Sequence, residues 1–166
     1  MLGLKEKKKM LNIFNPKMCL KRTLDTSWAC NLETSEEEKL PIEHIGGVPR
    51  LCFKYQDSAD DWLCGVVPLD KANWGPVDIR NYQDLKFTFY EESGVSLRIS
   101  LEDEKGNASK EIGLIDTQGV EAGQECEVSL NLHGFLQDGF NGRKTRLVKF
   151  IGINKPHFYV SNLYVF

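Results

Sequence analysis

Three segments in the second half of the chain place apolar residues at every second position. They read LKFTFY (residues 85–90), VSLRISL (95–101) and CEVSLNL (126–132). Because successive side chains of a β-strand point to opposite faces of a sheet, this period indicates strands with one buried and one solvent-facing side. Gly, Asn and Asp turn signals separate the runs, and the sequence shows no capped helical pattern of four turns. The pattern therefore predicts an all-β fold, an antiparallel β-sandwich of jelly-roll type.

The chain closes on two further apolar runs, RLVKFIGIN (146–154) and HFYVSNLYVF (157–166), with a turn at Lys155-Pro156 between them. We expect these to be the last two strands, lying in opposite sheets or at a sheet corner, where both are largely covered. In the first run, alternation with Ile151 and Ile153 predicts that Phe150 and Gly152 face outward. The residues predicted to face the core are Leu85, Phe87, Phe89, Leu97, Ile99, Val128, Leu130, Ile151 and Ile153.

A chain of 166 residues is long enough for one domain with a sizeable core. We expect a basic N-terminal tail or extension over residues 1–23 and a single β-sandwich domain over residues 24–166. The lysine run favours a solvated tail, and the alternatives are a short amphipathic segment packed on the domain or an upstream fragment before a second start at Met10. The first apolar residues are interrupted too early for a signal peptide. Location therefore stays open, with the cytoplasm favoured over secretion.

Charge and cysteine content exclude several classes of protein. A net charge of −3 is too small to draw nucleic acid to the whole surface, and no apolar stretch approaches the roughly 18 residues of a membrane span. The cysteines show no metal-ligand spacing. Two interpretations remain: reduced thiols in an intracellular protein, or a Cys52–Cys64 bridge between neighbouring strands in an oxidising compartment. The five cysteines are Cys19, Cys30, Cys52, Cys64 and Cys126.

Three longer segments carry a family resemblance: WGPVDIRNYQDLKFTFY (74–90), ECEVSLNLHGFLQDGFNG (125–142) and LVKFIGINKPHFYVSNLYVF (147–166). Their strand landmarks resemble those of galactose-binding-like β-jelly rolls, and within them carbohydrate-binding modules of families 11 and 30. The resemblance covers roughly residues 48–166. It implies a noncatalytic module that recognises a plant-type or microbial polysaccharide on a concave sheet, with β-glucans as the favoured class.

The resemblance also indicates the ligand-bearing sheet, built from the strands that contain DWLCGVV, VSLRISL, KEIGLID and LVKFIGIN. Aromatic faces and polar groups on the solvent side of these strands could contact a sugar. Each of three residues also has an interpretation without a ligand. Trp62 could be a core residue, Arg98 could be a solvated surface charge, and Phe150 could be covered by the N-terminal segment. The predicted ligand-binding residues are Trp62, Arg98, Ser100, Glu111, Phe150 and Asn154.

Family members commonly carry an aspartate in the closing strand, often near a structural calcium ion. This chain has Ser161 at that position. Because calcium prefers carboxylate and carbonyl oxygens, the change places an inherited calcium site in doubt. No other cofactor or metal is expected.

No catalytic signature accompanies these features. We expect the three histidines to lie in separate loops, without metal-ligand spacing or a paired nucleophile: His44, His133 and His157. The acidic residues are typical of turn carboxylates that keep a protein soluble, rather than of a glycosidase pair. We therefore expect a nonenzymatic protein whose partner is a polysaccharide or oligosaccharide, with a fused enzyme or sensor module, or a protein partner, as further candidates. The alternative function is an intracellular protein-interaction or assembly domain with the same fold.

Overall fold

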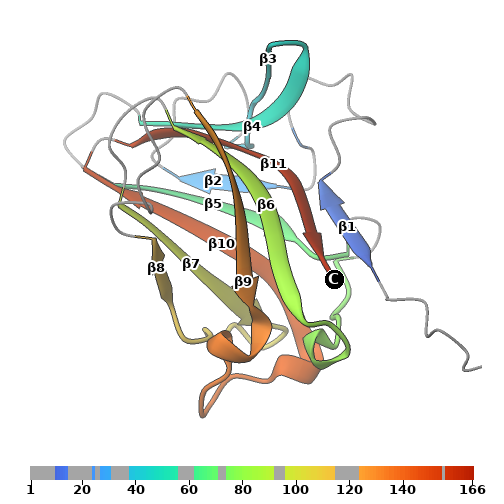
Figure 1. Cartoon of the computed structure of the whole chain (residues 1–166). Coiled ribbons are helices and arrows are strands. Elements are labelled where there is room, and N and C mark those ends of the chain that lie inside the picture. Colours follow the sequence, from blue (N-terminus) through green and yellow to red (C-terminus); the bar gives the residue numbers. More distant parts are fainter. Residues whose placement is uncertain are drawn as a thin grey trace, which may run out of the picture.

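Two β-sheets packed face to face make up the described part of the chain (Figure 1). The computed structural model describes residues 10–14, 24, 27–30, 38–55, 62–70, 74–91, 96–114, 124–154 and 156–166. The strand pairs within both sheets are antiparallel, which confirms the predicted all-β antiparallel sandwich. Over these residues, no helix is long and apolar enough to cross a membrane.

The six-stranded sheet has the order β3-β4-β11-β6-β9, and β1 pairs with β11 beside this path. The five-stranded sheet has the order β2-β5-β10-β7-β8. The strands of the first sheet are β1 (Leu11–Phe14), β3 (Ile42–Ile45), β4 (Val48–Lys54), β6 (Asp84–Glu91), β9 (Glu125–Asn131) and β11 (His157–Val165). Those of the second are β2 (Trp28–Cys30), β5 (Trp62–Pro68), β7 (Ser96–Asp103), β8 (Ile112–Leu114) and β10 (Thr145–Ile153).

The last two strands lie in opposite sheets, as the sequence predicted. Strand β10 runs between β5 and β7, and β11 runs between β4 and β6. The backbone N–H of Phe166 donates to the carbonyl of Asp84, and the Phe166 carbonyl accepts from Gln83 and Asp84. Because this end of the strand is paired within a sheet, Leu163 and Val165 are buried.

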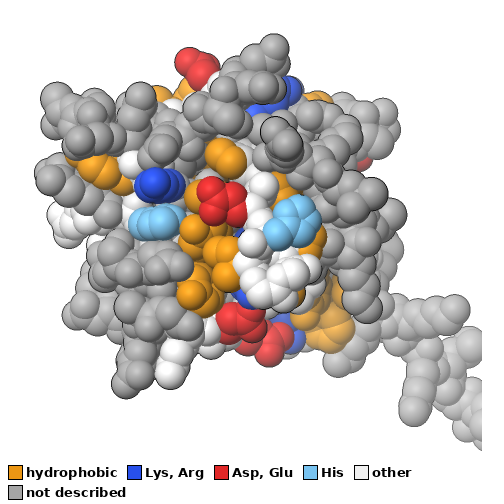
Figure 2. Space-filling view, turned by 90° about the horizontal axis from the view of Figure 1, so that it is seen from above, with side chains coloured by type: hydrophobic (Ala, Val, Ile, Leu, Met, Phe, Trp, Pro, Cys, Tyr) orange, Lys and Arg blue, Asp and Glu red, His pale blue; other side chains and the backbone are white. Residues whose placement is uncertain are grey.

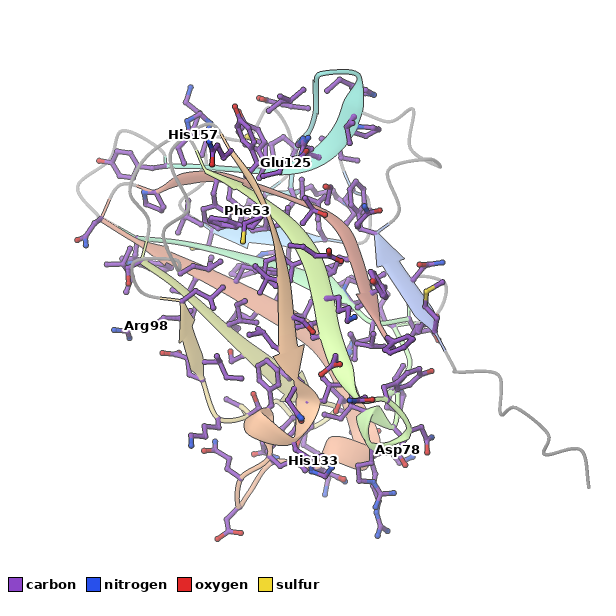
Figure 3. The ribbon with its side chains drawn as sticks, viewed as in Figure 1. Phe53, Asp78, Arg98, Glu125, His133 and His157 are labelled. Carbon is purple, nitrogen blue, oxygen red and sulfur yellow. The ribbon has the colours of Figure 1, made fainter. Side chains whose placement is uncertain are left out.

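Aromatic rings fill the space between the sheets. Phe53 stacks on Phe158 at 4.6 Å between centroids and lies 5.4 Å from Phe150, which meets Phe87 edge-on at 5.6 Å. Figure 3 shows Phe53 between the two layers. Of the residues predicted to face the core, the five on β6 and β7 are buried, and Val128 and Leu130 on the edge strand β9 pack against them.

The orientation of β10 is opposite to the prediction. Phe150 is fully buried at 0% exposure, whereas Ile151 and Ile153 lie on the outer side and are partly exposed. Gly152 also faces inward, where an added Cβ would lie 2.6 Å from Pro156. Lys149 shares the outer side with Ile151 and Ile153 and indicates the observed orientation, but the two isoleucines are more apolar than Gly152 and favoured the opposite one.

The sandwich begins before the predicted boundary at residue 24. Strand β1 pairs with the final residues of β11, and its Ile13 and Phe14 are buried in the core. The rest of the predicted tail or extension, residues 1–9 and 15–23, lies outside the described residues. The N-terminal region therefore contributes a strand to the six-stranded sheet.

The alternative interpretation of a Cys52–Cys64 bridge between neighbouring strands is wrong. Cys52 lies on β4 and Cys64 on β5, in different sheets. Cys52 alternates with buried Leu51 and Phe53, so its side chain points away from the core, and Cys64 likewise points outward from its own sheet. Because packed sheets are about 10 Å apart, the two thiols are separated by the thickness of the sandwich.

Candidate functional site

The outer face of the five-stranded sheet brings two exposed tryptophans together with polar side chains. The strands that the family resemblance assigned to the ligand-bearing sheet are β5, β7, β8 and β10, and all four lie in this sheet. The fifth strand, β2, adds one edge. We call the outward residues of these strands the tryptophan face: Trp28, Cys30, Trp62, Cys64, Val66, Ser96, Arg98, Ser100, Glu102, Gly113, Lys149, Ile151 and Ile153, together with Glu111 beside β8.

Trp28 and Trp62 are 45% and 42% exposed, although large apolar side chains are usually buried. Trp28 stands opposite Val66 of β5, and Trp62 stands opposite Ile153 of β10. Trp62 and Val66 are four residues apart on one strand, a distance of about 13 Å at a rise of about 3.4 Å per residue. The two indoles therefore bracket a stretch of sheet longer than a single sugar ring.

Apolar side chains cover the sheet between the tryptophans. Ile151 and Ile153 are partly exposed there, because they are the outward residues of β10. Val66 and Cys64 are buried on the same face. The tryptophan face thus offers a largely apolar floor between two aromatic rings.

Ion pairs border this floor on the side of β7 and β8. Arg98 Nη1 lies 3.4 Å from Glu111 Oε1, and both side chains are about half exposed. Lys149 Nζ lies 3.4 Å from Glu102 Oε2. In Figure 3, Arg98 projects from the outer side of the sandwich beside β8. These groups can donate and accept hydrogen bonds at the edge of the apolar floor.

The structure brings part of the predicted site together. Trp62, Arg98 and Glu111 all lie on the tryptophan face. Ser100 lies on it too, but it is only 6% exposed, since it sits on β7 opposite Lys149. Asn154 is exposed at the end of β10, with a positive φ of 67° that suits a turn residue.

Phe150 does not belong to the site. Its ring lies between the sheets, in contact with Phe53 and Phe87, so the predicted ligand role is wrong. The aromatic residue that sequence reasoning missed is Trp28. Its strand has three residues, Trp28–Cys30, too few to show a period of two.

The outer face of the six-stranded sheet is built differently. Arg50 is buried, with 5% of its side chain exposed; it forms an ion pair with Glu125 and lies 5.4 Å from the centre of the Tyr90 ring. The Tyr159 hydroxyl lies 2.9 Å from His157 Nε2 and donates to Glu43 at 3.2 Å. Viewed from above, the molecule shows acidic, basic and histidine side chains intermixed with apolar ones (Figure 2).

Cys52 contacts this polar network, and its thiol is held in the protonated form at neutral pH. Burial, reinforced by the negative charge of Glu43, raises the pKa of the Cys52 thiol to about 12. A thiol with so high a pKa carries almost no thiolate, which is the reactive form. The network therefore links strands β3, β4 and β11 rather than forming a nucleophilic site.

Asp103 at the end of β7 is an extensively hydrogen-bonded carboxylate. It accepts hydrogen bonds from the backbone N–H groups of Lys105, Asn107 and Asn141 and from the Asn107 side chain. Burial tends to raise its pKa, but these hydrogen bonds outweigh burial and hold the pKa below its usual value. Its oxygens face N–H donors, so Asp103 holds two loops together and is unsuited to bind a cation.

The position predicted to replace a calcium-linked aspartate, Ser161, is buried within β11. Across the ranges that the structure describes, no three His, Cys, Asp or Glu side chains are grouped so that they could hold a metal ion.

Comparisons with known proteins add evidence on the fold. No protein-family model matches the chain, and no curated protein matches it in sequence. Solved structures do match. The family 30 carbohydrate-binding module of the cellulosomal cellulase Cel9D-Cel44B of Clostridium thermocellum superposes with a TM-score of 0.73 at 18% identity, over 95% of this chain and 97% of that one.

Two further modules share the arrangement. A family 11 carbohydrate-binding module from Clostridium thermocellum, in complex with a β-1,3-1,4-mixed-linked tetrasaccharide, has a TM-score of 0.60 at 11% identity over 94% of each chain. A family 28 module described as specific for non-crystalline cellulose has a TM-score of 0.54 at 13% identity, over 87% of this chain and 89% of that one. The fold is therefore that of a carbohydrate-binding-module jelly roll.

Proposed function

We propose that this protein is a noncatalytic carbohydrate-binding domain and that its tryptophan face binds an extended polysaccharide of the β-glucan class. The observation that carries the proposal is the exposure of Trp28 and Trp62 on one sheet face. The similarity of the whole chain to carbohydrate-binding modules supports it, since two of those modules are described with a mixed-linked β-glucan and with cellulose.

The chemistry of the face suits a sugar chain. Indole rings can stack on the C–H faces of pyranose rings, and the partly exposed isoleucines between them leave room for a chain lying along the sheet. Arg98 and Glu111 at the border can exchange hydrogen bonds with hydroxyl groups, and the exposed Asn154 at the end of β10 offers a further amide. A chain with equatorial hydroxyls presents such flat apolar faces and polar edges, which favours a β-glucan.

The same face is unsuited to hydrolysis. A glycosidase needs two carboxyl groups that flank the scissile bond, one of them poised as an acid. The carboxylates Glu102 and Glu111 on this face are each paired with a cation, Lys149 and Arg98 respectively. The proposed role is therefore binding alone.

An open face makes few buried contacts, so we expect dissociation constants on the order of 10–100 μM. Isothermal titration calorimetry with oligosaccharides of mixed-linked β-glucan, cellulose, xyloglucan and mannan tests this expectation. Trp62→Ala and Trp28→Ala should each weaken binding by about 1–3 kcal/mol, which would bring it near the limit of detection. Arg98→Ala should have a smaller effect, because solvent screens the interactions of a charged group at the border of an open face.

A matched control is Tyr164→Ala, which removes a partly exposed aromatic ring from the other sheet. This variant should bind glycan like the wild type. No heat with any glycan would reject the proposal and favour the protein-interaction function. Equal losses in the Tyr164 and Trp62 variants would place the ligand elsewhere.

A further inference from the structure

Two cysteines face each other across neighbouring strands at the β2 edge of the tryptophan face. Cys30 of β2 stands directly opposite Cys64 of β5 in the antiparallel register. The flanking residues Ala29 and Gly65 both face the core: Ala29 is buried, and a Cβ on Gly65 would lie 2.5 Å from Phe53. The two cysteine side chains therefore share the outer side of the sheet.

The spacing of this pair fits a disulfide bond. The N–H of Ala29 donates to Glu38 on the side away from β5, so the backbone groups of Cys30 point toward β5. Opposite residues of this kind have Cα atoms about 5.5 Å apart, within the range of about 4.4–6.8 Å seen in disulfides. Their Cβ atoms are about 5 Å apart, slightly more than a relaxed disulfide needs, and β2 is a three-residue edge strand that can move closer.

The other described cysteines have no such neighbour. Cys52 lies on the outer side of the other sheet, and Cys126 lies on β9, separated from β4 by two strands. The free thiols of these two residues and of Cys30 and Cys64 are the four that the structure describes. Only Cys30 and Cys64, among these four, are opposed across a strand pair.

We propose that Cys30 and Cys64 form a reversible disulfide that ties the edge strand β2, and with it Trp28, to the rest of the tryptophan face. This assigns a thiol modification site to the β2 edge of the proposed binding surface. Its link to glycan binding rests on the proposed function, whereas the formation of the bond does not.

The oxidant is a small disulfide such as glutathione disulfide. The Cys30 thiolate attacks one sulfur of the small disulfide and releases one small thiol. Cys64 then gives its proton to solvent and attacks the Cys30 sulfur, which forms the intramolecular bond and releases the second small thiol. Two protein thiols are oxidised and one small disulfide is reduced to two thiols.

The environments of the two thiols set this order. Cys64 is buried, and burial raises the pKa of its thiol to about 11 although Lys149 opposes the shift. Cys30 is partly exposed and is therefore the more accessible group for the first attack. The second step is intramolecular, so proximity offsets the low thiolate content of Cys64.

The bond should alter the face in a measurable way. Cys30 and Cys64 are 34 positions apart, so the bridge closes a long loop and reduces the freedom of the unfolded chain. Strand β2 pairs with β5 through three residues only, and Trp28 is two residues from Cys30. A bridge would therefore hold the Trp28 ring in place over the sheet, which lowers the ordering cost of binding.

The test equilibrates the full chain with glutathione disulfide, blocks free thiols under denaturing conditions and maps peptides by mass spectrometry. We expect a peptide pair that joins Cys30 to Cys64, with Cys52 and Cys126 alkylated, and reversal by reduced glutathione. The oxidised protein should melt about 5–10 °C above the reduced protein. Alkylation of both Cys30 and Cys64 under oxidising conditions, or their pairing with other cysteines, would overturn the proposal.

Cys30→Ala and Cys64→Ala should each abolish the redox-dependent change in melting temperature, while the matched control Cys52→Ala should keep it. Bridge formation with no rise in melting temperature would contradict the tethering of β2. For glycan, we expect binding of a mixed-linked β-glucan oligosaccharide to be at least threefold tighter in the oxidised protein. Equal affinity in the oxidised and reduced proteins would show that the disulfide does not affect glycan binding. If the bridge forms but neither state binds glycan, the proposed function is rejected and the disulfide proposal stands.

Discussion

The outer faces of the two sheets differ in how their side chains are used. On the six-stranded sheet, Arg50, Cys52 and Tyr159 point outward yet are buried. Arg50 pairs with Glu125 and Tyr159 donates to Glu43, although Arg50 Nε and Nη1 have no hydrogen-bond partner in the described part of the chain. On the five-stranded sheet, Trp28 and Trp62 point outward and stay exposed. Strand alternation produces both faces, so alternation alone does not decide whether an outward residue is satisfied within the fold or available to a ligand.

We infer from this difference that the outer face of the six-stranded sheet contributes to stability and that the tryptophan face contributes to binding. Groups in a closed polar network are stabilised by their partners, and removal of one leaves another unsatisfied. The large apolar side chains that remain exposed on the other sheet form the surface for which we propose a binding role. We therefore expect substitutions on the six-stranded sheet to affect stability and those on the tryptophan face to affect binding.

The largest effect is expected from the core shared by both faces. Phe150→Ala removes a ring that is fully buried against Phe53 and Phe87, so unfolding free energy should fall by about 3–5 kcal/mol. Urea unfolding followed by fluorescence measures the loss. A fall in unfolding free energy of less than about 1 kcal/mol, combined with loss of glycan binding, would instead show that Phe150 lies on the outer face. The contrast between the two faces would then be wrong.

Asp103 belongs to neither face and provides a reference at one end of the sandwich. Asp103→Asn should lower stability by about 2 kcal/mol at pH 7, because the charged carboxylate accepts four hydrogen bonds. Since the folded-state pKa of Asp103 is lowered, its stabilising contribution is present above the unfolded value near 4 and is lost as pH falls through the folded value.

Melting temperatures of wild type and Asp103→Asn, measured between pH 7 and pH 3, check this prediction. The two should differ most at pH 7 and converge below about pH 4. A gap that stayed constant over this range would show that the charge of Asp103 is not the source of its contribution.

The closed face is probed through its ion pair. Glu125→Ala leaves the Arg50 guanidinium, whose Nε and Nη1 already lack hydrogen-bond partners in the described part of the chain, without its counter-ion. Because Glu125 is about half exposed, we expect a moderate loss of about 1–2 kcal/mol by chemical denaturation. Glu127→Ala, two residues along β9 on the same side, is the control and should change stability by less than about 0.5 kcal/mol.

The smallest effect on stability is expected on the open face. Trp28→Ala and Trp62→Ala should each lower the unfolding free energy by less than about 1 kcal/mol, because nearly half of each side chain is already in solvent. Thermal denaturation of both variants measures this. Losses as large as that of Phe150→Ala would show that the tryptophans are core residues and would erase the contrast between the two faces.

The fold was largely predictable because β6, β7 and β9 carry one polar and one apolar face. Their alternation identified strands and buried side chains correctly. The last strands were recognised as well, and so was their division between the sheets. Strand β10 was assigned the wrong face, because Ile151 and Ile153 were interpreted as core residues although the charged Lys149 lies on the same side of the strand.

The site was predictable in part. Trp62, Arg98 and Glu111 follow from strand alternation once their strands share a sheet. Trp28 could not be found this way, since its strand is short and its partner β5 is 34 positions further along the chain. The cysteine pair was missed for the same reason: a cross-strand contact depends on register, and sequence spacing does not reveal it.

The central claim is that glycan binds the open face and leaves the closed one untouched. Chemical-shift mapping by ¹H–¹⁵N NMR during titration with a mixed-linked β-glucan oligosaccharide tests it most directly. We predict that the indole N–H signals of Trp28 and Trp62 and the amides of β5 and β10 shift, while those around Tyr159 on β11 stay in place. Shifts confined to β4 and β11, or no shifts at millimolar oligosaccharide, would contradict the claim.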